Sequence, residues 1–542
     1  MAPIALAFAL LASAATLVDV SVPLSSSGAV TLSPSLVSFS IEQDRWPEWA
    51  GESARNTFFY NALENLRQKT GEPPWIRIGA DSEDHTNFNA ATQYVNDIFP
   101  AYTAIVPYPE ASNITVGDKF YQLVSNLPSG THVWWGVSLR EDNLTSAYLE
   151  TKAIVKAFAS AAVKNAGITL DFIEVGNEAD LYVNNGGRRA PYGPTQYVPD
   201  WVKIATNVSA AAGLSSTSHT KLIGAAFASS SHTTTGMSPQ GIFAAGILSS
   251  KPGKLITTIS QHHYSGSFCK GSGGLLQNLM TKATIRSNLT AFAPDIAATQ
   301  KQGLAYVLGE TNSYSCHGAP GVSNTAGAAL WALDYALYAP QIGISRVFFH
   351  EGVGYKYNLI QPVSLNRSIL DGSALSKPLA PHVQPAYYAA IIAAEAIGSS
   401  GSTKSVELAI NNPYLAGYAF YEGGTLARVL LINSKAYLTS SNTARGSLKV
   451  NLDFTKGTAP KTMQVKRLTI GHADDTSGLK WGGQSYETSD ALVSGYENVP
   501  ATTVTSGITI SDTEVVLVQF LVSGSGGALK RGCNLKRGSD SE

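Results

Sequence analysis

Two glutamates each follow a short apolar run of the kind that forms a buried β-strand. Glu178 ends the segment Asp171-Phe-Ile-Glu-Val-Gly-Asn-Glu, and Glu310 ends the segment Leu304-Ala-Tyr-Val-Leu-Gly-Glu. In a (β/α)8 barrel the chemistry takes place at the carboxyl ends of the strands, and hydrolysis of a glycosidic bond uses two carboxylates. The pair therefore predicts a barrel enzyme that cleaves sugars.

A lone glutamate after an apolar run is more often a loop or helix-start residue than a catalyst. Asn177, directly before Glu178, favours catalysis at this position, because a neighbouring amide can hydrogen-bond a sugar hydroxyl next to the scissile bond. We therefore interpret Glu178 and Glu310 as the catalytic residues and Asn177 as a sugar-binding residue.

A repeating pattern from residue 36 to about 350 is what must position these side chains. Short apolar runs alternate there with amphipathic or Ala-rich stretches, as in repeated βα units. The strand candidates are Leu36–Ile41, Trp75–Gly79, His132–Val137, Phe172–Gly176, Lys221–Ala226, Thr257–His262, Ala305–Gly309 and Arg346–His350. The helix candidates include Ala54–Lys69, Ser146–Asn165, Thr195–Ala212, Leu276–Phe292 and Thr325–Tyr338. Eight alternating units predict an α/β fold, a (β/α)8 TIM barrel, over residues 31–398.

The pattern changes after a last Ala-rich helix candidate, Tyr387–Ile397. Alternating β-rich runs such as Leu415–Tyr421 and Glu514–Phe520, separated by turn residues, predict a β-sandwich domain over residues 399–523. The N-terminal segment 15–30 contains the run Thr16–Val22, which can add a strand to that sandwich. The tail 524–542 has no apolar period, and we expect it to be disordered.

Composition points to a secreted protein without nucleic-acid or membrane partners. Lys and Arg number 38 and Asp and Glu 39 among 542 residues, so the chain as a whole has no basic footprint. Residues 1–14 form an apolar stretch too short to span a bilayer and end in Ala12-Ser13-Ala14, which predicts a signal peptide and an extracellular location. Five glycosylation sequons fit that location. They are at Asn113, Asn143, Asn207, Asn288 and Asn366.

Three cysteines allow one disulfide, and the secretory prediction makes oxidation expected. Cys269 and Cys316 follow the predicted sixth and seventh strands, so their loops should lie side by side on one rim of the barrel. We predict that these two pair and that Cys533 stays free. No group of cysteines and histidines has the spacing of a metal site, and we expect neither a metal nor another cofactor.

Polar and aromatic residues follow several predicted strands and should share the rim with the two glutamates. For the histidines a structural role is more common than acid–base work, whereas aromatic rings offer flat faces on which a sugar can stack. The rim residues are Glu42, Asp44, Asp81, Glu178, His262, His263, Tyr264 and Glu310.

At these positions the sequence resembles glycoside hydrolase family 79, which contains β-glucuronidases and heparanase. Gly176-Asn-Glu178 is similar to the family's acid/base motif, and Gly309-Glu-Thr-Asn-Ser313 is similar to its nucleophile motif. Further matches are Phe39–Glu42, His262–Tyr264, Gly318–Pro320, Ala329–Tyr335 and Val347–Tyr357, and the segments Glu42–Trp46 and Ile360–Pro362 resemble the fungal branch. The resemblance implies hydrolysis with retention of configuration, and a C-terminal β-sandwich packed on the barrel.

One segment departs from the family pattern. Heparanase and bacterial members carry Tyr-Gly-Gly shortly after the nucleophile, where a tyrosine hydroxyl and glycine amides bind the sugar carboxylate. The corresponding residues here are Ser315, Cys316 and His317, preceded by Tyr314. The amides of Cys316 and His317 can still bind a carboxylate, with help from Tyr314 and from Tyr357, which matches a family tyrosine after the eighth strand.

The sequence therefore predicts a secreted, retaining β-glucuronidase that releases terminal β-linked glucuronic acid, or its 4-O-methyl form, from glycans. Glu310 is the expected nucleophile and Glu178 the expected acid/base. Glu42, Asp44, Asn177, His263, Tyr264, Tyr314, Cys316, His317 and Tyr357 are the expected substrate-binding residues. The alternatives are a family member specific for a neutral sugar and a non-catalytic carbohydrate-binding or cell-wall protein.

Overall fold

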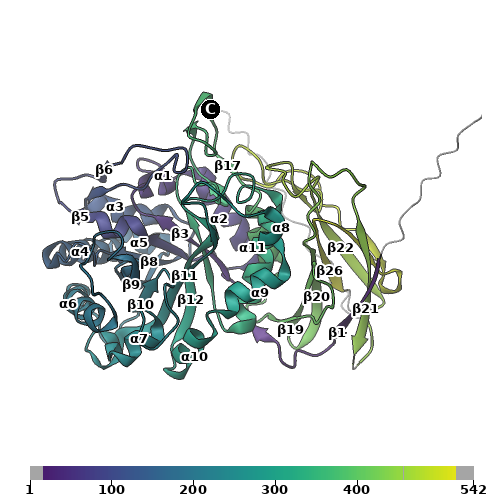
Figure 1. Cartoon of the computed structure of the whole chain (residues 1–542), viewed down its shortest axis with the longest axis horizontal. Helices are drawn as coiled ribbons and strands as arrows, with labels where there is room; N and C mark the ends of the chain where they lie inside the picture. Colours follow the sequence, from purple (N-terminus) through teal and green to yellow (C-terminus); the bar gives the residue numbers. More distant parts are fainter. Residues whose placement is uncertain (1–15, 456, 521–542) are drawn as a thin grey trace, which may run out of the picture.

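Eight parallel strands close into a barrel, which forms the left half of the molecule in Figure 1. The computed structural model describes residues 16–455 and 457–520. The barrel strands are β3 (Val37–Glu42), β4 (Ile76–Gly79), β8 (His132–Val137), β9 (Thr169–Val175), β10 (Lys221–Phe227), β11 (Ile256–Ser267), β12 (Ala305–Ser315) and β13 (Val347–Glu351). All eight strands predicted from the sequence are present, and the barrel prediction is confirmed.

Two strands are longer than their apolar runs predict. The sequence places their ends at His262 and Gly309, but β11 continues to Ser267 and β12 to Ser315. The extra residues are polar, yet they pair in parallel register, with His262 opposite Glu310 and Ser267 opposite Ser315. Backbone pairing thus extends a rigid ribbon past the point where the apolar period ends, and this ribbon carries several site residues.

Helices cover the outside of the barrel, and local signals explain where they begin. The Asn56 and Asn143 side chains accept hydrogen bonds from the first backbone amides of α2 and α4, which caps them. The helices are α1 (Trp46–Ala50), α2 (Thr57–Thr70), α3 (Asp118–Gln122), α4 (Leu144–Ala159), α5 (Ala161–Ala166), α6 (Pro194–Ala212), α7 (Pro239–Ala244), α8 (Leu276–Met280), α9 (Lys282–Thr290), α10 (Ala293–Lys301), α11 (Ala326–Tyr338) and α12 (Tyr387–Ile397).

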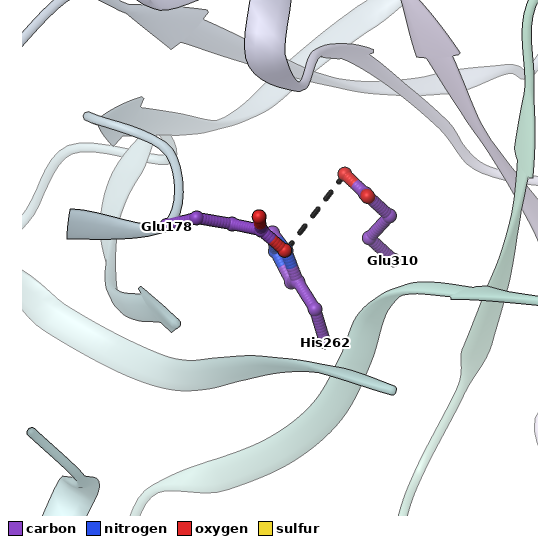
Figure 2. Close-up of side chains that lie close together, drawn as sticks. All are labelled: Glu178, His262 and Glu310. Atoms are coloured by element: carbon purple, nitrogen blue, oxygen red, sulfur yellow. Dashed lines mark hydrogen bonds and ion pairs between the residues drawn. The ribbon is translucent and has the colours of Figure 1, made fainter. Parts of the chain in front are cut away.

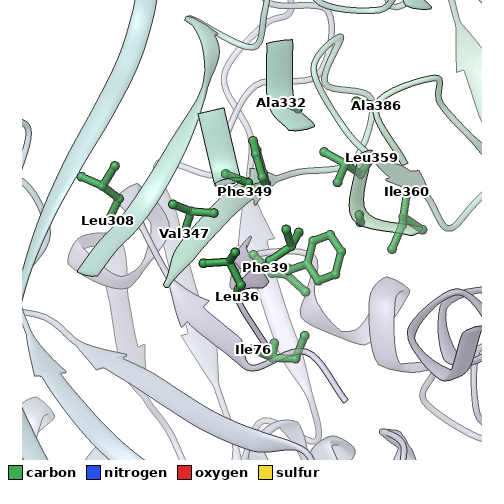
Figure 3. Close-up of a cluster of buried hydrophobic side chains, with 14 of the residues drawn as sticks. Leu36, Phe39, Ile76, Leu308, Ala332, Val347, Phe349, Leu359, Ile360 and Ala386 are labelled. Atoms are coloured by element: carbon green, nitrogen blue, oxygen red, sulfur yellow. The ribbon is translucent and has the colours of Figure 1, made fainter. Parts of the chain in front are cut away.

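One apolar core runs from the barrel wall into the C-terminal half. Figure 3 shows part of it, where Phe39, Val347 and Phe349 of β3 and β13 face Leu359 and Ile360. The same core includes α11 and α12, which bury nearly every side chain, and the sheet residues Tyr418, Leu430 and Leu517. The two helices are apolar all round because they lie between the barrel and the sheet.

The C-terminal half contains two facing sheets with their own apolar core, on the right of Figure 1. The larger sheet has the order β2 (Val30–Thr31), β18 (Lys404–Glu407), β19 (Leu415–Glu422), β20 (Thr425–Asn433), β26 (Glu514–Phe520), β22 (Thr462–Thr469) and β23 (Lys480–Trp481), with β24 (Ala501–Thr503) beside β22. The smaller sheet has the order β1 (Thr16–Pro23), β21 (Ser447–Thr455) and β25 (Ile508–Ser511). The first described strand thus belongs to the C-terminal sandwich.

Insertions between barrel strands form small additional sheets. One has three strands, β5 (Thr86–Phe88), β7 (Asn113–Val116) and β6 (Val95–Ile98). The other two are pairs, β14 (Ile360–Gln361) with β17 (His382–Val383), and β15 (Leu365–Arg367) with β16 (Ala374–Leu379). The loop between β6 and β7 reaches the active-site rim.

Several predictions concern segments that the structure does not describe or features that it does not test. The predicted signal peptide, the predicted disordered tail and Cys533 lie outside the described residues. The predicted division at 398/399 falls between α12 and β18. Asn113, Asn143 and Asn366 are exposed, whereas Asn207 and Asn288 are partly buried on α6 and α9. Within the described ranges, no helix combines the length and apolar character needed to cross a membrane.

Candidate active site

Glu310 lies in β12, where the strand rises out of the barrel, and its side chain is 7% exposed. Its Oε2 accepts a hydrogen bond from Nη1 of Arg77 at 2.8 Å, and its Oε1 accepts one from the Tyr264 hydroxyl at 2.7 Å. Nδ1 of His350 is 3.9 Å from Oε2. Both carboxylate oxygens therefore have donors that fix the orientation of the group.

The surroundings of Glu310 favour its ionised form. Burial raises the pKa of this carboxyl, but His350, His262 and Arg77 lower it by more, so that it lies well below its usual range. Arg77 is the permanent charge among them, because burial lowers the pKa of His262 to about 3 and also lowers that of His350. An ionised, fixed carboxylate is what a nucleophile requires.

Glu178 follows β9 after a sharp turn. Gly176 has φ 81°, and a Cβ there would lie 2.4 Å from Cβ of Leu139, so the turn needs glycine. Glu178 itself has the left-handed backbone angles φ 47° and ψ 44°, and its amide donates to the Ala226 carbonyl at 2.8 Å. Non-glycine residues seldom adopt this conformation, which is enriched at functional sites.

The Glu178 side chain is 22% exposed and points toward His262, as Figure 2 shows. Its Oε1 is 3.0 Å from Nδ1 of His262. Burial, followed by the negative charge of Glu310, raises the pKa of Glu178 well above its usual range. The pKa values of the two glutamates are thus shifted in opposite directions, which is the pattern of an acid paired with a nucleophile.

The two carboxyl groups face each other across a short gap (Figure 2). One oxygen of Glu178, Nδ1 of His262 and one oxygen of Glu310 all lie within 4.8 Å of one another. Such a trio has the residue types of a metal site, but the Arg77 guanidinium, bound directly to Glu310, disfavours a cation there. A short carboxylate separation is the arrangement that retaining glycosidases use, at about 5 to 5.5 Å.

Asn177 lies beside the pair with its amide fixed. Its Oδ1 accepts a hydrogen bond from Nη2 of Arg77 at 2.8 Å, and its backbone amide donates to Asp84 at 3.1 Å. With Oδ1 engaged by arginine, Nδ2 is the end of the amide left to donate to a ligand. This orientation fits the role of a donor to a sugar hydroxyl.

Aromatic and acidic groups line the far side of Glu310. The Tyr357 ring is 6.0 Å from that of Tyr264, centroid to centroid; Tyr357 is buried and Tyr264 is half-buried. Glu42 binds Nε2 of His350 at 3.1 Å and the Ser82 amide at 3.0 Å. Tyr264 and Tyr357 therefore offer a wall for a sugar, whereas Glu42 acts on the site through His350.

A disulfide joins Cys269 and Cys316, as predicted from their positions after neighbouring strands. Cys316 and His317 both have left-handed backbone angles, with φ of 58° and 65°. His317 binds Glu110 at 2.5 Å through Nε2 and stacks on Tyr355 with a centroid separation of 3.6 Å. The loop after Glu310 is thus fixed from both sides.

Comparisons with known proteins agree with this architecture. Residues 417–517 match the model of the Glycosyl hydrolase family 79 C-terminal beta domain. A beta-glucuronidase of Neurospora crassa is 28% identical over 496 residues, covering 83% of this chain and 84% of the relative. A beta-glucuronidase of Aspergillus niger is 29% identical over 476 residues, covering 83% and 82%. The matched domain and the two fungal relatives support membership of glycoside hydrolase family 79, on its fungal branch.

Solved structures of barrel glycosidases also resemble this chain. The crystal structure of a 4-O-alpha-L-rhamnosyl-beta-D-glucuronidase from Fusarium oxysporum, in complex with Rha-GlcA, has a TM-score of 0.73 and 25% identity, and the match covers 93% of this chain and all of that one. A family 51 alpha-L-arabinofuranosidase of Bifidobacterium longum has a TM-score of 0.58 and 16% identity, and the match covers 93% of this chain and all of that one. The second likeness concerns the fold alone. The protein is a glycoside hydrolase.

Like Glu42, three further residues expected to bind substrate have other partners: Asp44, His263 and Tyr314. Both oxygens of the Asp44 carboxylate accept backbone amides, from Arg45 at 2.7 Å and Ala111 at 2.9 Å, so Asp44 holds a loop. His263 points out of the barrel, because alternate strand residues face opposite sides, and its Nδ1 binds the Tyr335 hydroxyl at 2.8 Å. These two positions correct the sequence-based expectation.

Tyr314 is the third. Its ring packs on Gly266, where a Cβ would lie 2.3 Å from the ring, and its hydroxyl lies over Gly274. It supports the loop that carries Cys269 and is not brought against Glu178 or Glu310. The register of β12 explains this, because Tyr314 pairs with Gly266 high on the ribbon, above the carboxylates.

Arg77 is the main functional residue that sequence reasoning missed. It stands between Ile76 and Ile78 in a strand where every residue is buried. A fully buried arginine needs anionic partners, so its presence in an apolar strand was a usable signal. Glu110, in contrast, reaches His317 from a loop 207 residues away in sequence, and no local pattern indicates that contact.

Proposed function

We propose that this chain is a retaining β-glucuronidase that releases terminal β-linked glucuronic acid from glycans or glycoconjugates. The observation that carries the proposal is the short gap between Glu310, whose pKa is lowered, and Glu178, whose pKa is raised. The fungal relatives named as beta-glucuronidases support the choice of sugar.

In the proposed first step, Glu310 attacks the anomeric carbon while Glu178 protonates the leaving oxygen. Arg77 and Tyr264 hold the attacking carboxylate in place. Esterification removes the negative charge of Glu310, and with it one cause of the raised pKa of Glu178. Glu178 can then act as the base that activates water in the second step.

The sugar carboxylate is expected on the Glu310 side of the gap, near Tyr357 and the loop of Cys316 and His317. A carboxylate can bind backbone amides whatever the side chain, and left-handed angles at both residues turn the local backbone away from strand pairing. The Tyr357 hydroxyl would add a charge-assisted hydrogen bond. Nε2 of His317 is already bound to Glu110, so this ring nitrogen is not the anchor of the sugar carboxylate.

We also propose that the enzyme acts outside the cell. The N-terminal stretch 1–14, the sequons and the Cys269–Cys316 disulfide support this, because disulfides persist in oxidising compartments. Detection of the enzyme and of glycosylated peptides in culture medium tests it. Recovery of the protein only from cell extracts, with all sequons unmodified, would contradict it.

Hydrolysis of a panel of aryl β-glycosides by the purified enzyme tests the proposed activity. The glucuronide should be cleaved with a much higher kcat/KM than the glucoside, the galactoside or the xyloside, and the first sugar product, followed by NMR, should be the β-anomer. A preference for a neutral glycoside would favour the neutral-sugar alternative. Binding without turnover of any of them would favour a carbohydrate-binding protein.

The Fusarium relative acts on a glucuronide substituted by rhamnose at O4. Its similarity makes a 4-O-substituted glucuronide the second candidate substrate. Parallel assays with unsubstituted, 4-O-methylated and 4-O-rhamnosylated aryl glucuronides decide between them, because only the ratio of kcat/KM values reports on the group at O4.

A further inference from the structure

The Arg77 guanidinium has no hydrogen-bond donor to spare. Nε and one Nη2 hydrogen go to Oε1 of Glu174, at 3.0 and 2.5 Å. The two Nη1 hydrogens go to Glu310 at 2.8 Å and to Ser40 at 2.9 Å, and the other Nη2 hydrogen goes to Asn177 at 2.8 Å. All five N–H groups of the side chain are thus engaged.

A further glutamate, Glu83, lies in the same buried core without a donor. Its side chain is fully buried, and its Oε2 is 3.9 Å from Nη2 of Arg77, too far for a hydrogen bond. Among the described residues, neither oxygen of Glu83 has a hydrogen-bond partner, and neither does Oε2 of Glu174. Three buried carboxyl oxygens without a protein donor would carry a desolvation cost.

The backbone around Glu83 leaves space for this carboxyl group. A Cβ at Gly136 would lie 1.7 Å from Oε2 of Glu83, and one at Gly79 would lie 2.2 Å from the same atom. Both glycines are on barrel strands, and Gly136 pairs with Glu174 in the barrel register. The carboxyl of Glu83 therefore occupies a space that two glycines keep open next to Glu174.

We propose that Glu83 is a neutral carboxylic acid whose hydroxyl donates to Oε2 of Glu174, and that this buried acid pair positions Arg77 against Glu310. One shared proton satisfies an oxygen on each glutamate. It also reduces the charge of the cluster, since one guanidinium would otherwise face three carboxylates within the barrel. Glu174, held by Glu83 on one oxygen and by Arg77 on the other, then fixes the guanidinium.

The electrostatics agree with this geometry. Burial, and then the negative charge of Glu174, raises the pKa of Glu83 well above its usual range. The charged groups that act on Glu83 are Glu174, Arg77 and Asp84, and of these only Arg77 favours ionisation. Asp84 is turned to other donors, the amides of Leu139, Arg140 and Asn177 and the Tyr182 hydroxyl.

The first test is the pH dependence of folding stability in E83Q, with E174Q as the matched control. A carboxyl with a raised folded-state pKa stabilises the protein fully below its unfolded pKa, and that contribution is lost as pH rises. Glutamine cannot ionise. Above about pH 4.5, each pH unit should therefore raise the unfolding equilibrium constant of the wild type about tenfold relative to that of E83Q, which corresponds to about 1.4 kcal/mol of unfolding free energy. Denaturant titrations at several pH values measure this.

The second test is spectroscopic. Infrared difference spectra of the wild type minus E83Q at pH 7 should contain the carbonyl-stretching band of a protonated carboxylic acid. A pH-independent stability difference together with the absence of this band would overturn the proposal. If the band disappears in E174Q and persists in E83Q, the proton belongs to Glu174 and the assignment is wrong.

The positioning part of this inference rests on the proposed function, so kinetics test it separately. Glutamine at position 83 can still donate to Glu174, whereas leucine cannot, so kcat/KM for the glucuronide should be at least tenfold higher in E83Q than in E83L, with E174Q among the weakest variants. Equal activities in E83Q and E83L would reject the positioning role. If the wild type cleaves no glycoside, the proposed function fails, while the stability and infrared results still decide on the buried proton.

Discussion

The side of the site around Glu310, the proposed nucleophile, is braced by several donors, whereas the side around Glu178, the proposed acid, is held by one histidine and a left-handed backbone conformation. Arg77 and Tyr264 bind Glu310 directly, and its side chain is 7% exposed. Glu178 contacts His262 and is 22% exposed. The comparison shows that opposite pKa shifts follow from opposite environments: Arg77 lies beside Glu310, whereas Glu178 has burial and the nearby charge of Glu310 to raise its pKa.

The largest effect on turnover is expected from a change at Glu310. Glu310→Gln removes the proposed nucleophile and should lower kcat/KM by about 10⁴-fold or more, because the proposed glycosyl-enzyme forms on this carboxylate. Steady-state rates with an aryl glucuronide measure this, and an unchanged melting temperature serves as the folding control. Substantial activity in a preparation free of wild-type enzyme would mean that the nucleophile is another residue.

The acid side should respond according to the leaving group. Glu178→Ala should lower kcat/KM by about 10²- to 10⁴-fold for a poorly activated aglycone and far less for a nitrophenyl one, which needs little protonation. Added azide should restore turnover and give a β-glycosyl azide. Equal losses on both aglycones, with no azide product, would remove Glu178 from the acid role.

The variant Tyr357→Phe tests whether the Glu310 side of the site also binds the sugar carboxylate. A charge-assisted hydrogen bond is worth about 1.5 to 3 kcal/mol, so Tyr357→Phe should lower kcat/KM for glucuronides by about 10- to 100-fold. The matching glucoside lacks the carboxylate and should lose much less. The ratio of the two losses is the measurement, because general damage to the site would depress both substrates alike.

The comparison also predicts how the two carboxyls communicate. Removing the charge of Glu310 should lower the pKa of Glu178, because that charge is the second cause of its raised value after burial. Carbon-13 NMR titration of the Glu178 carboxyl in wild type and in Glu310→Gln measures the shift. In the wild type, kcat/KM should fall on the alkaline side as Glu178 loses its proton. An unchanged Glu178 pKa in the variant would show that burial alone sets it.

The smallest effect on turnover is expected from the disulfide. Its ends are 47 residues apart, and in the chain-entropy model such a loop closure stabilises by about 4 kcal/mol. The double change Cys269→Ser with Cys316→Ser should therefore lower the unfolding free energy by up to that amount while kcat changes only a few-fold. A large loss of kcat with unaltered stability would instead place the disulfide among the groups that shape the site directly.

Much of this molecule can be predicted from its sequence because the barrel strands are apolar. Runs such as His132–Val137 are bounded by the same residues in sequence and structure. The carboxyl ends of such strands must share a rim, so Glu178 and Glu310 could be brought together on that argument alone. The disulfide follows from the same reasoning, since the loops after β11 and β12 are neighbours.

The parts that could not be predicted depend on pairing and on long-range contacts. The polar extension of β11 is a strand because β12 lies beside it, and not because of its own composition. The direction of a side chain follows from strand register, which separates His262, facing Glu178, from its neighbour His263, facing α11. Contacts between distant loops, such as Glu110 with His317, are not indicated by any hydrophobic periodicity of the sequence.

The pairing of β1 with β21 has a consequence for how the chain folds during synthesis. Thr16 of β1 lies opposite Leu448. The first described strand can therefore pair only after a segment more than 400 residues later in the sequence has been synthesised. Val20 and Val22, both fully buried in the finished sandwich, stay uncovered until then. The barrel can close before this pairing forms, since domains tend to fold as they emerge. The small sheet of the sandwich therefore cannot be completed until β21 has been made, and during that interval an unpaired β1 exposes an edge that a chaperone or an aggregating chain can bind.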